Sequence, residues 1–101
     1  MAEFTKVAKA SEIPKGGAKV VEIGGRKVAL FNCNGTLYAT ENVCAHRGGP
    51  LGEGMLSGTS VTCPWHGWEF DVTTGASTMN PAAKVHTFAV KVEGEDVLVG
   101  L

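Results

Sequence analysis

Two short stretches of the sequence each pair one cysteine with one histidine. Cys44-Ala45-His46 is followed, after sixteen residues, by Cys63-Pro64-Trp65-His66. On a tight turn, a cysteine and a histidine at such short spacing can point the same way. Two such turns that face each other would supply two sulfurs and two nitrogens. A fold that uses this pattern has to bring the two stretches together, and it can then hold one metal ion or two.

Zinc is the chemically closest alternative, because two cysteines and two histidines also suit a tetrahedral zinc site. Common zinc sites keep the cysteines in one knuckle and the histidines in another, whereas each stretch here mixes the two residue types. Mixing suits a two-iron, two-sulfide cluster with cysteines on one iron and histidines on the other. The spacing therefore favours the cluster, and a structural zinc module remains as an alternative.

The rest of the chain has the composition of a β-sheet protein. Twelve Val, two Ile and nine Thr outweigh six Leu, and the 14 Gly lie mostly between short apolar runs at hairpin spacing. Gly24-Gly25 and Asn34-Gly35 tolerate the positive φ of two-residue hairpin turns. Phe88, Val90 and Val92 alternate with other residues, which predicts a strand with one buried face. The expected strands are Lys19 to Ile23, Arg26 to Phe31, a stretch ending near Cys33, Thr36 to Thr40, His86 to Val92, and Val97 to Leu101.

The 101 residues leave room for one domain, 1–101. The only helical candidate is a turn near Ser11-Glu12-Ile13, which Pro14 cuts off. Between residues 42 and 81 glycine becomes dense, and three of the four prolines and both tryptophans occur there. We predict an all-β fold in which 1–41 and 82–101 form a small antiparallel sandwich. Residues 42–81 are then an inserted subdomain of loops and short strands that binds the metal.

Charge and cysteine content exclude several classes of function. Nine Lys and Arg against ten Asp and Glu give a net charge of −1, which leaves no electrostatic footprint for nucleic acid or an anionic membrane. The start of the chain has no apolar signal-peptide core, so we expect a cytoplasmic protein. Three cysteines make a disulfide framework improbable. Cys33 is expected to be a reduced structural thiol, and His86 an ordinary strand histidine.

The whole pattern resembles the Rieske iron-sulfur proteins. Cys-x-His, sixteen residues and Cys-x-x-His are followed by the run Gly67-Trp68-Glu69-Phe70-Asp71. Over nearly all 101 residues, the chain is similar to the free-standing Rieske ferredoxins that serve bacterial aromatic-ring oxygenases. The resemblance implies the Rieske fold and one 2Fe-2S cluster. It assigns Cys44 and Cys63 to one iron and His46 and His66 to the other, with the histidine edge at the surface.

The resemblance also suggests residues around the cluster. Asn80-Pro81 looks like the third loop that closes over the cluster, with Met79 as an apolar cover. Trp65 would form an apolar docking patch with Pro64 and Pro50. The candidates for the cluster environment or for docking are Arg47, Pro64, Trp65, Trp68 and Pro81.

The implied function is one-electron carriage. A flavin-dependent NAD(P)H reductase would reduce the protein, which would then dock transiently on a terminal oxygenase and reduce it. The chain would not be an enzyme and would take no small-molecule substrate. With two histidines in the cluster, His86 alone cannot build the two-histidine, one-carboxylate iron site of an oxygenase, so the oxygenase is another protein. The alternative is a small Rieske-like subunit of a nitrite reductase or another redox complex.

Departures from the respiratory branch of the family predict a low reduction potential. That branch has a disulfide-forming cysteine in each loop, where this chain has Gly49 and Trp65, and it has two hydroxyls near the cluster, where this chain has Trp68 and Phe70. Hydrogen bonds to cluster sulfurs stabilise the reduced state, so their loss lowers the potential. A redox titration should give a value at the low end of the Rieske range of roughly −150 to +300 mV. A value in the upper half would contradict this prediction.

Overall fold

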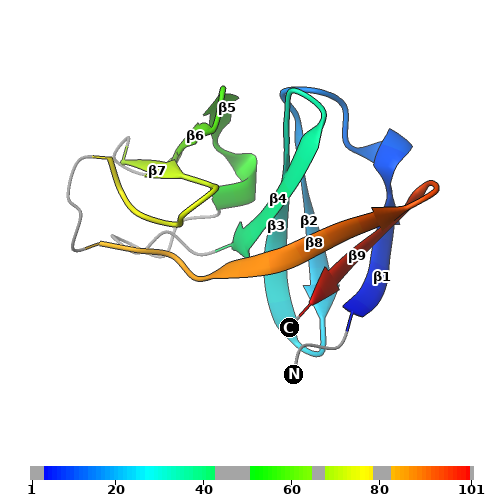
Figure 1. Ribbon diagram of the computed structural model, residues 1–101. Helices are drawn as coiled ribbons and strands as arrows, with labels where there is room; N and C mark the ends of the chain where they lie inside the picture. Colours follow the sequence, from blue (N-terminus) through cyan, green and yellow to red (C-terminus); the bar gives the residue numbers. More distant parts are fainter. Residues whose placement is uncertain (1–3, 43–50, 65–67, 79–82, 101) are drawn as a thin grey trace.

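The computed structural model describes residues 4–42, 51–64, 68–78 and 83–100. Its strands are β1 (Phe4–Lys9), β2 (Ala18–Ile23), β3 (Arg26–Cys33), β4 (Thr36–Glu41), β5 (Met55–Ser57), β6 (Ser60–Thr62), β7 (Glu69–Asp71), β8 (Thr87–Glu93) and β9 (Asp96–Gly100). Two antiparallel sheets result, with strand orders β1-β9-β8-β4-β3-β2 and β5-β6-β7 (Figure 1). The short 3-10 helices are η1 (Ala10–Glu12) and η2 (Leu51–Glu53). No helix in these ranges is long and apolar enough to cross a membrane.

The predicted hairpins are confirmed, and their turns have the expected backbone. Gly24 and Gly25 both have positive φ, at 56° and 84°, between β2 and β3. Asn34 and Gly35 do the same between β3 and β4, at 55° and 102°. Two successive residues with positive φ match the right-handed twist of the flanking strands. Strand β3 ends at Cys33, as expected, and the predicted stretches Arg26 to Phe31 and the one ending near Cys33 form this single strand, which pairs with β4 from Val28 onward.

Strand β1 was not predicted, and it pairs antiparallel with β9 at the other end of the chain. Together with β8, these strands pack over β2, β3 and β4 as the second layer of a sandwich (Figure 1). The apolar side chains between the two layers form the basal core. Its buried members are Ala8, Ile13, Val28, Leu30, Ala39, Val97 and Val99.

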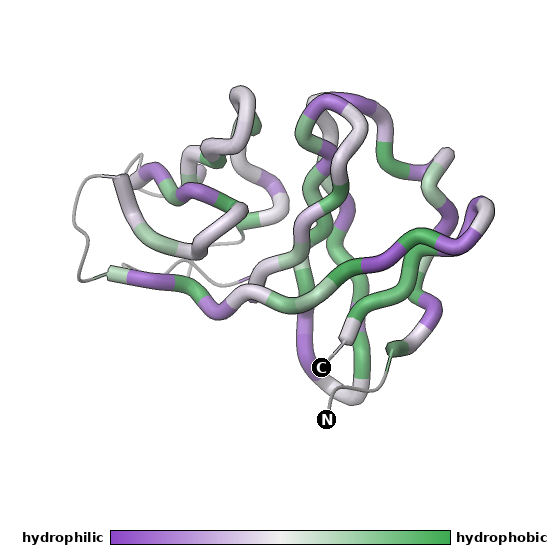
Figure 2. The backbone as a smooth tube through the Cα atoms, viewed as in Figure 1, coloured by the Kyte–Doolittle hydropathy of each residue, from purple (hydrophilic) through white to green (hydrophobic). Residues whose placement is uncertain are grey.

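A second cluster, the site-side core, joins the smaller sheet to the opposite face of β3. Ala29, Phe31 and Cys33 alternate with the basal-core residues of the same strand, so β3 is buried on both faces. Figure 2 colours the hydrophobic residues of β3 green. The buried members of the site-side core are Ala29, Phe31, Cys33, Leu51, Val61, Cys63, Phe70, Val72 and Val85.

The predicted alternation in β8 holds for only part of the strand. Phe88 and Val90 are half-buried against the basal core, whereas Val92 is 47% exposed. Val92 pairs with Val97, and only one further residue pair separates them from the β8–β9 turn. The strand therefore extends past the core at its end, and the expectation that Val92 is buried is wrong.

Replacing Asn32 with alanine should destabilise the fold. Its buried side-chain amide donates to the carbonyl of Ile13 at 2.7 Å, and its Oδ1 accepts from the Gly35 N–H at 2.7 Å. Asn32→Ala leaves two backbone groups without these partners, so chemical denaturation should show a loss of about 1–3 kcal/mol. Met55→Ala is the control, because Met55 is 80% exposed. Equal effects of the two variants would refute the role given to Asn32.

Candidate metal centre

Of the four predicted ligands, Cys63 is the one that lies within the described residues. It is the first residue after β6, and only 1% of it is exposed. Its backbone N–H donates to the carbonyl of Trp68 at 2.7 Å, which continues the β6–β7 pairing beyond Thr62 and Glu69. This bond joins the two residues between which the segment with His66 lies in the sequence. The next residue, Pro64, is exposed, so the chain passes from the core to the surface in one step.

Besides Cys63, the structure places Pro64 and Trp68 among the predicted site residues. Outside the described residues lie Cys44, His46, Arg47, Gly49, Pro50, Trp65, His66, Met79, Asn80 and Pro81. These residues belong to the segments 43–50, 65–67 and 79–82. The structure describes the residues on either side of each segment.

The segment that contains Cys44 and His46 begins and ends on two hydrogen-bonded residues. The Oδ1 of Asn42 accepts from the Gly52 N–H at 2.6 Å. The N–H of Asn42 donates to the carbonyl of Lys27 at 3.1 Å, which attaches this pair to β3. Leu51, immediately before Gly52, is fully buried in the site-side core. The end of the first ligand segment therefore packs in the same core as Cys63.

The segment that contains Pro81 is closed in the same way. The N–H of Ser77 donates to the carbonyl of Ala83 at 2.9 Å, and that of Thr78 donates to the carbonyl of Glu69 at 3.0 Å. The carbonyls of Trp68 and Glu69, neighbours in the chain, thus bind the bases of the second and third segments. The second and third segments therefore start from one small framework around β6 and β7, whereas the first is attached to β3.

The environment of Cys63 fits an iron-sulfur cluster. Its sulfur belongs to an almost water-free side chain among aliphatic and aromatic residues. A soft thiolate in such a setting is a ligand that iron-sulfur clusters use. Trp68 is half-buried against the same core, with its ring centroid 6.5 Å from that of Phe70, which is fully buried. Neither ring carries a hydroxyl, in accord with the sequence.

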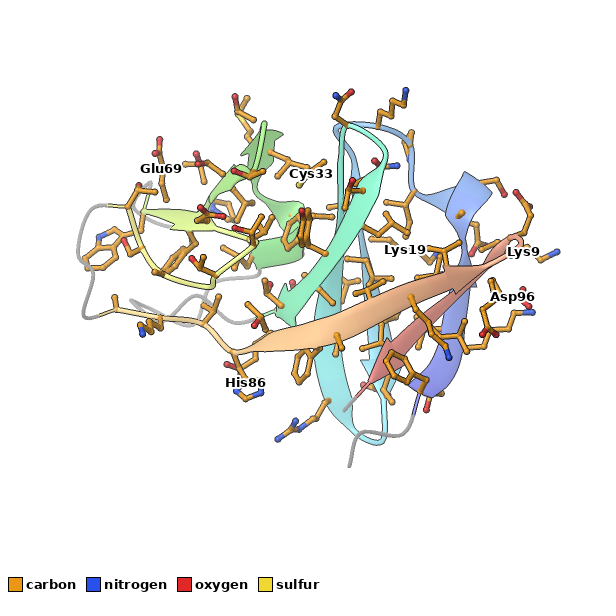
Figure 3. The ribbon with its side chains drawn as sticks, viewed as in Figure 1. Lys9, Lys19, Cys33, Glu69, His86 and Asp96 are labelled. Carbon is orange, nitrogen blue, oxygen red and sulfur yellow. The ribbon has the colours of Figure 1, made fainter. Side chains whose placement is uncertain are left out.

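Cys33 lies in the same core but is not a predicted ligand. It is buried on the side of β3 that faces the smaller sheet (Figure 3). Burial raises the pKa of the Cys33 thiol above its ordinary value, and the negative charge of Asp71 raises it further. At neutral pH the thiol therefore stays protonated and poorly reactive. This supports the prediction of a reduced structural thiol.

His86 is an exposed residue immediately before β8, which begins at Thr87 rather than at His86 as expected, and its side chain points away from the sheet (Figure 3). Its backbone N–H donates to Oε1 of Glu41 at 2.8 Å, and its ring lies 5.0 Å from that of Phe88. A nearby hollow of about 190 Å³ is lined by Arg26, Lys27, Glu41 and Phe88. Because cations and a carboxylate share its lining, the hollow does not select a ligand of either charge.

Comparison with known proteins identifies the family. The chain matches the Rieske [2Fe-2S] domain over residues 3–97. It belongs to the Rieske 2Fe-2S domain family. This match supports a 2Fe-2S cluster as the cofactor, in place of the zinc alternative.

Individual Rieske proteins are similar over most of their length. The ferredoxin component of the naphthalene 1,2-dioxygenase system of Pseudomonas aeruginosa is 37% identical over 91 residues, covering 89% of this chain and 88% of that protein. A chain from a structure described as a complex of reduced oxygenase and oxidized ferredoxin in carbazole 1,9a-dioxygenase has a TM-score of 0.88 and 33% identity, with 96% and 92% coverage. A chain named for an NADH-dependent nitrite reductase small subunit of Mycobacterium tuberculosis has a TM-score of 0.91 with 100% and 96% coverage, but at 21% identity it shows the fold alone.

Asn42 and Leu51 were not among the predicted site residues. An asparagine before a loop is a common turn residue, and one leucine in a glycine-rich stretch has no periodic pattern around it. The only local signal was position, because Asn42 comes two residues before Cys44.

The Cys33 thiol should react with iodoacetamide only at a higher pH in the folded protein than in the unfolded chain. The raised pKa keeps the thiol protonated as the pH rises through its ordinary value of 9.0, while the unfolded thiol already ionises there. Peptide mass spectrometry after labelling across this pH range separates Cys33 from the other cysteines. Equal labelling of both states at pH 8 would show that Cys33 is accessible and unperturbed.

Proposed function

We propose that this protein is a one-electron carrier, a Rieske ferredoxin that passes electrons from a flavin-dependent NAD(P)H reductase to a terminal oxygenase. The observation that carries the proposal is the 37% identity to a dioxygenase ferredoxin component, with nearly nine-tenths of both chains covered. The solved complex of an oxygenase with a ferredoxin supports the oxygenase as a partner. In this role the chain itself is a carrier and not a catalyst.

The proposed ligands are Cys44 and Cys63 on one iron and His46 and His66 on the other. When bound, the cluster accepts one electron and releases it again, one iron alternating between the ferric and ferrous states. Cys63 keeps its thiolate inside the site-side core, and the backbone bond to Trp68 fixes where that residue lies. The half-buried Trp68 ring helps to exclude water from this side.

The proposed subdomains follow the two sheets. Strands β5, β6 and β7 all fall within residues 42–81, and the six strands of the larger sheet lie within 1–41 and 82–101 or end on those boundaries. We assign cluster binding to the inserted part and support to the sandwich. Partners would dock transiently at the histidine edge, with the exposed Pro64 next to Trp65 and Pro50 as an apolar patch. Small, weak interfaces suit such rapid exchange.

The alternative of a permanent nitrite reductase subunit has weaker support. The similarity to such a subunit is one of fold at 21% identity, whereas the ferredoxin relative shares 37%. Gel filtration distinguishes the two roles, because a carrier elutes alone and a permanent subunit copurifies with a large chain.

Two buried cysteines provide a matched test of the ligand assignment. Cys63 and Cys33 lie in the same core at 1% and 7% exposure, but Cys63 alone of this pair is a proposed ligand. Cys63→Ala should abolish the visible absorption and the reduced-state EPR signal of a histidine-ligated cluster. Cys33→Ala should retain both, because it removes only a thiol from the packing.

The wild-type protein sets the reference for this comparison. It should contain about two irons per chain and take up one electron in a dithionite titration. A colourless protein with one zinc per chain, or a native spectrum in Cys63→Ala, would overturn the proposal.

A further inference from the structure

Asn42 ties together the two ends of the segment that contains Cys44 and His46. Its residue exposure is 8%, and its Oδ1 accepts from the Gly52 N–H at 2.6 Å. The Asn42 N–H donates in turn to the carbonyl of Lys27 on β3. One side chain therefore closes a ten-residue span of chain and attaches it to the central strand.

The contact between Asn42 and Gly52 leaves no spare room. A Cβ atom on Gly52 would lie 2.8 Å from the Asn42 Oδ1 and 2.5 Å from Cγ2 of Val20, closer than real Cβ atoms approach their neighbours. Gly52 therefore meets the acceptor because it has no side chain. The preceding residue, Leu51, is fully buried in the core that also contains Cys63. A shift of Gly52 would consequently disturb the core that contains Cys63.

We propose that Asn42 is a positioning residue for the iron centre, acting through its hydrogen bond to Gly52. The inference rests on the proposed function, in which the first segment supplies one thiolate and one imidazole. Closing a flexible loop costs conformational entropy, and a bond between its ends reduces the number of arrangements that the ligands can adopt. Asn42 thereby fixes where the segment with Cys44 and His46 begins and ends.

The experiment measures iron release to a ferrous chelator and the EPR g-values of the dithionite-reduced protein. Asn42→Ala removes the acceptor, and iron release should become about fivefold faster, the factor that corresponds to one net hydrogen bond. The EPR signal should shift or broaden because the ligand geometry is less defined. Asn42→Asp keeps an oxygen at the same place, so its iron release and line width should stay close to those of the wild type.

Asn32→Ala is the matched control. Asn32 is an equally buried asparagine, at 9% exposure, and its Oδ1 accepts from another glycine N–H, that of Gly35 at 2.7 Å. Its bonds lie at the β3–β4 turn, so this variant should lose stability while keeping the wild-type EPR signal and rate of iron release. If Asn42→Ala does not accumulate folded, Asn42→Ser replaces it, because its hydroxyl is too short to keep the acceptor in place.

The outcomes separate the inference from the proposed function. Iron release and EPR signals that are the same in Asn42→Ala and Asn32→Ala would overturn the positioning role. Rates for Asn42→Asp as fast as those for Asn42→Ala would also overturn it, since the acceptor would then be irrelevant. A wild-type protein without a 2Fe-2S signal would instead overturn the proposed function, and the inference with it.

Discussion

Strand β3 places apolar side chains on both of its faces, and both cores depend on its position. Val28 and Leu30 point into the basal core, whereas Ala29 and Phe31 point into the site-side core. A register slip of one residue would exchange these two sets of side chains. Both cores would then lose their packing at once, so both disfavour the slip. The two-residue turns on either side of β3 reinforce the same register. The placement of Cys63 is therefore determined by strand pairing far from it in the sequence.

The framework around the metal site consists mostly of backbone hydrogen bonds. Trp68 and Glu69 present consecutive carbonyls that bind the residues flanking two segments, and the Asn42 side chain joins the residues flanking the third. Backbone partners are independent of side-chain identity, so the residues between them can differ in sequence while the described ends stay in place. Each of these segments therefore has fixed starting points in the described part of the chain.

The hairpins could be predicted from the sequence because they rest on local chemistry, and the ligand set stays a prediction of the same local kind. Positive φ restricts which residues can form the turn at Asn34-Gly35, and few residue types can bind iron. Strand β1 and the roles of Asn32 and Asn42 could not be predicted in this way. The partner of β1 is the last strand of the chain, and Asn32 bonds to Ile13, nineteen residues earlier. Such pairings depend on the whole fold, which no local pattern contains.

The same aromatic residues contribute to packing and to the expected low potential. Phe70 is fully buried in the site-side core, and Trp68 packs against that core from outside. A hydroxyl at the buried ring would need its own hydrogen-bond partner, since an unsatisfied one costs about 1–3 kcal/mol. A donor that found its partner in a cluster sulfur would stabilise the reduced state and raise the potential. The Phe70 ring avoids both effects because it carries no polar group, so apolar packing at this buried position also favours release of the electron to the next protein.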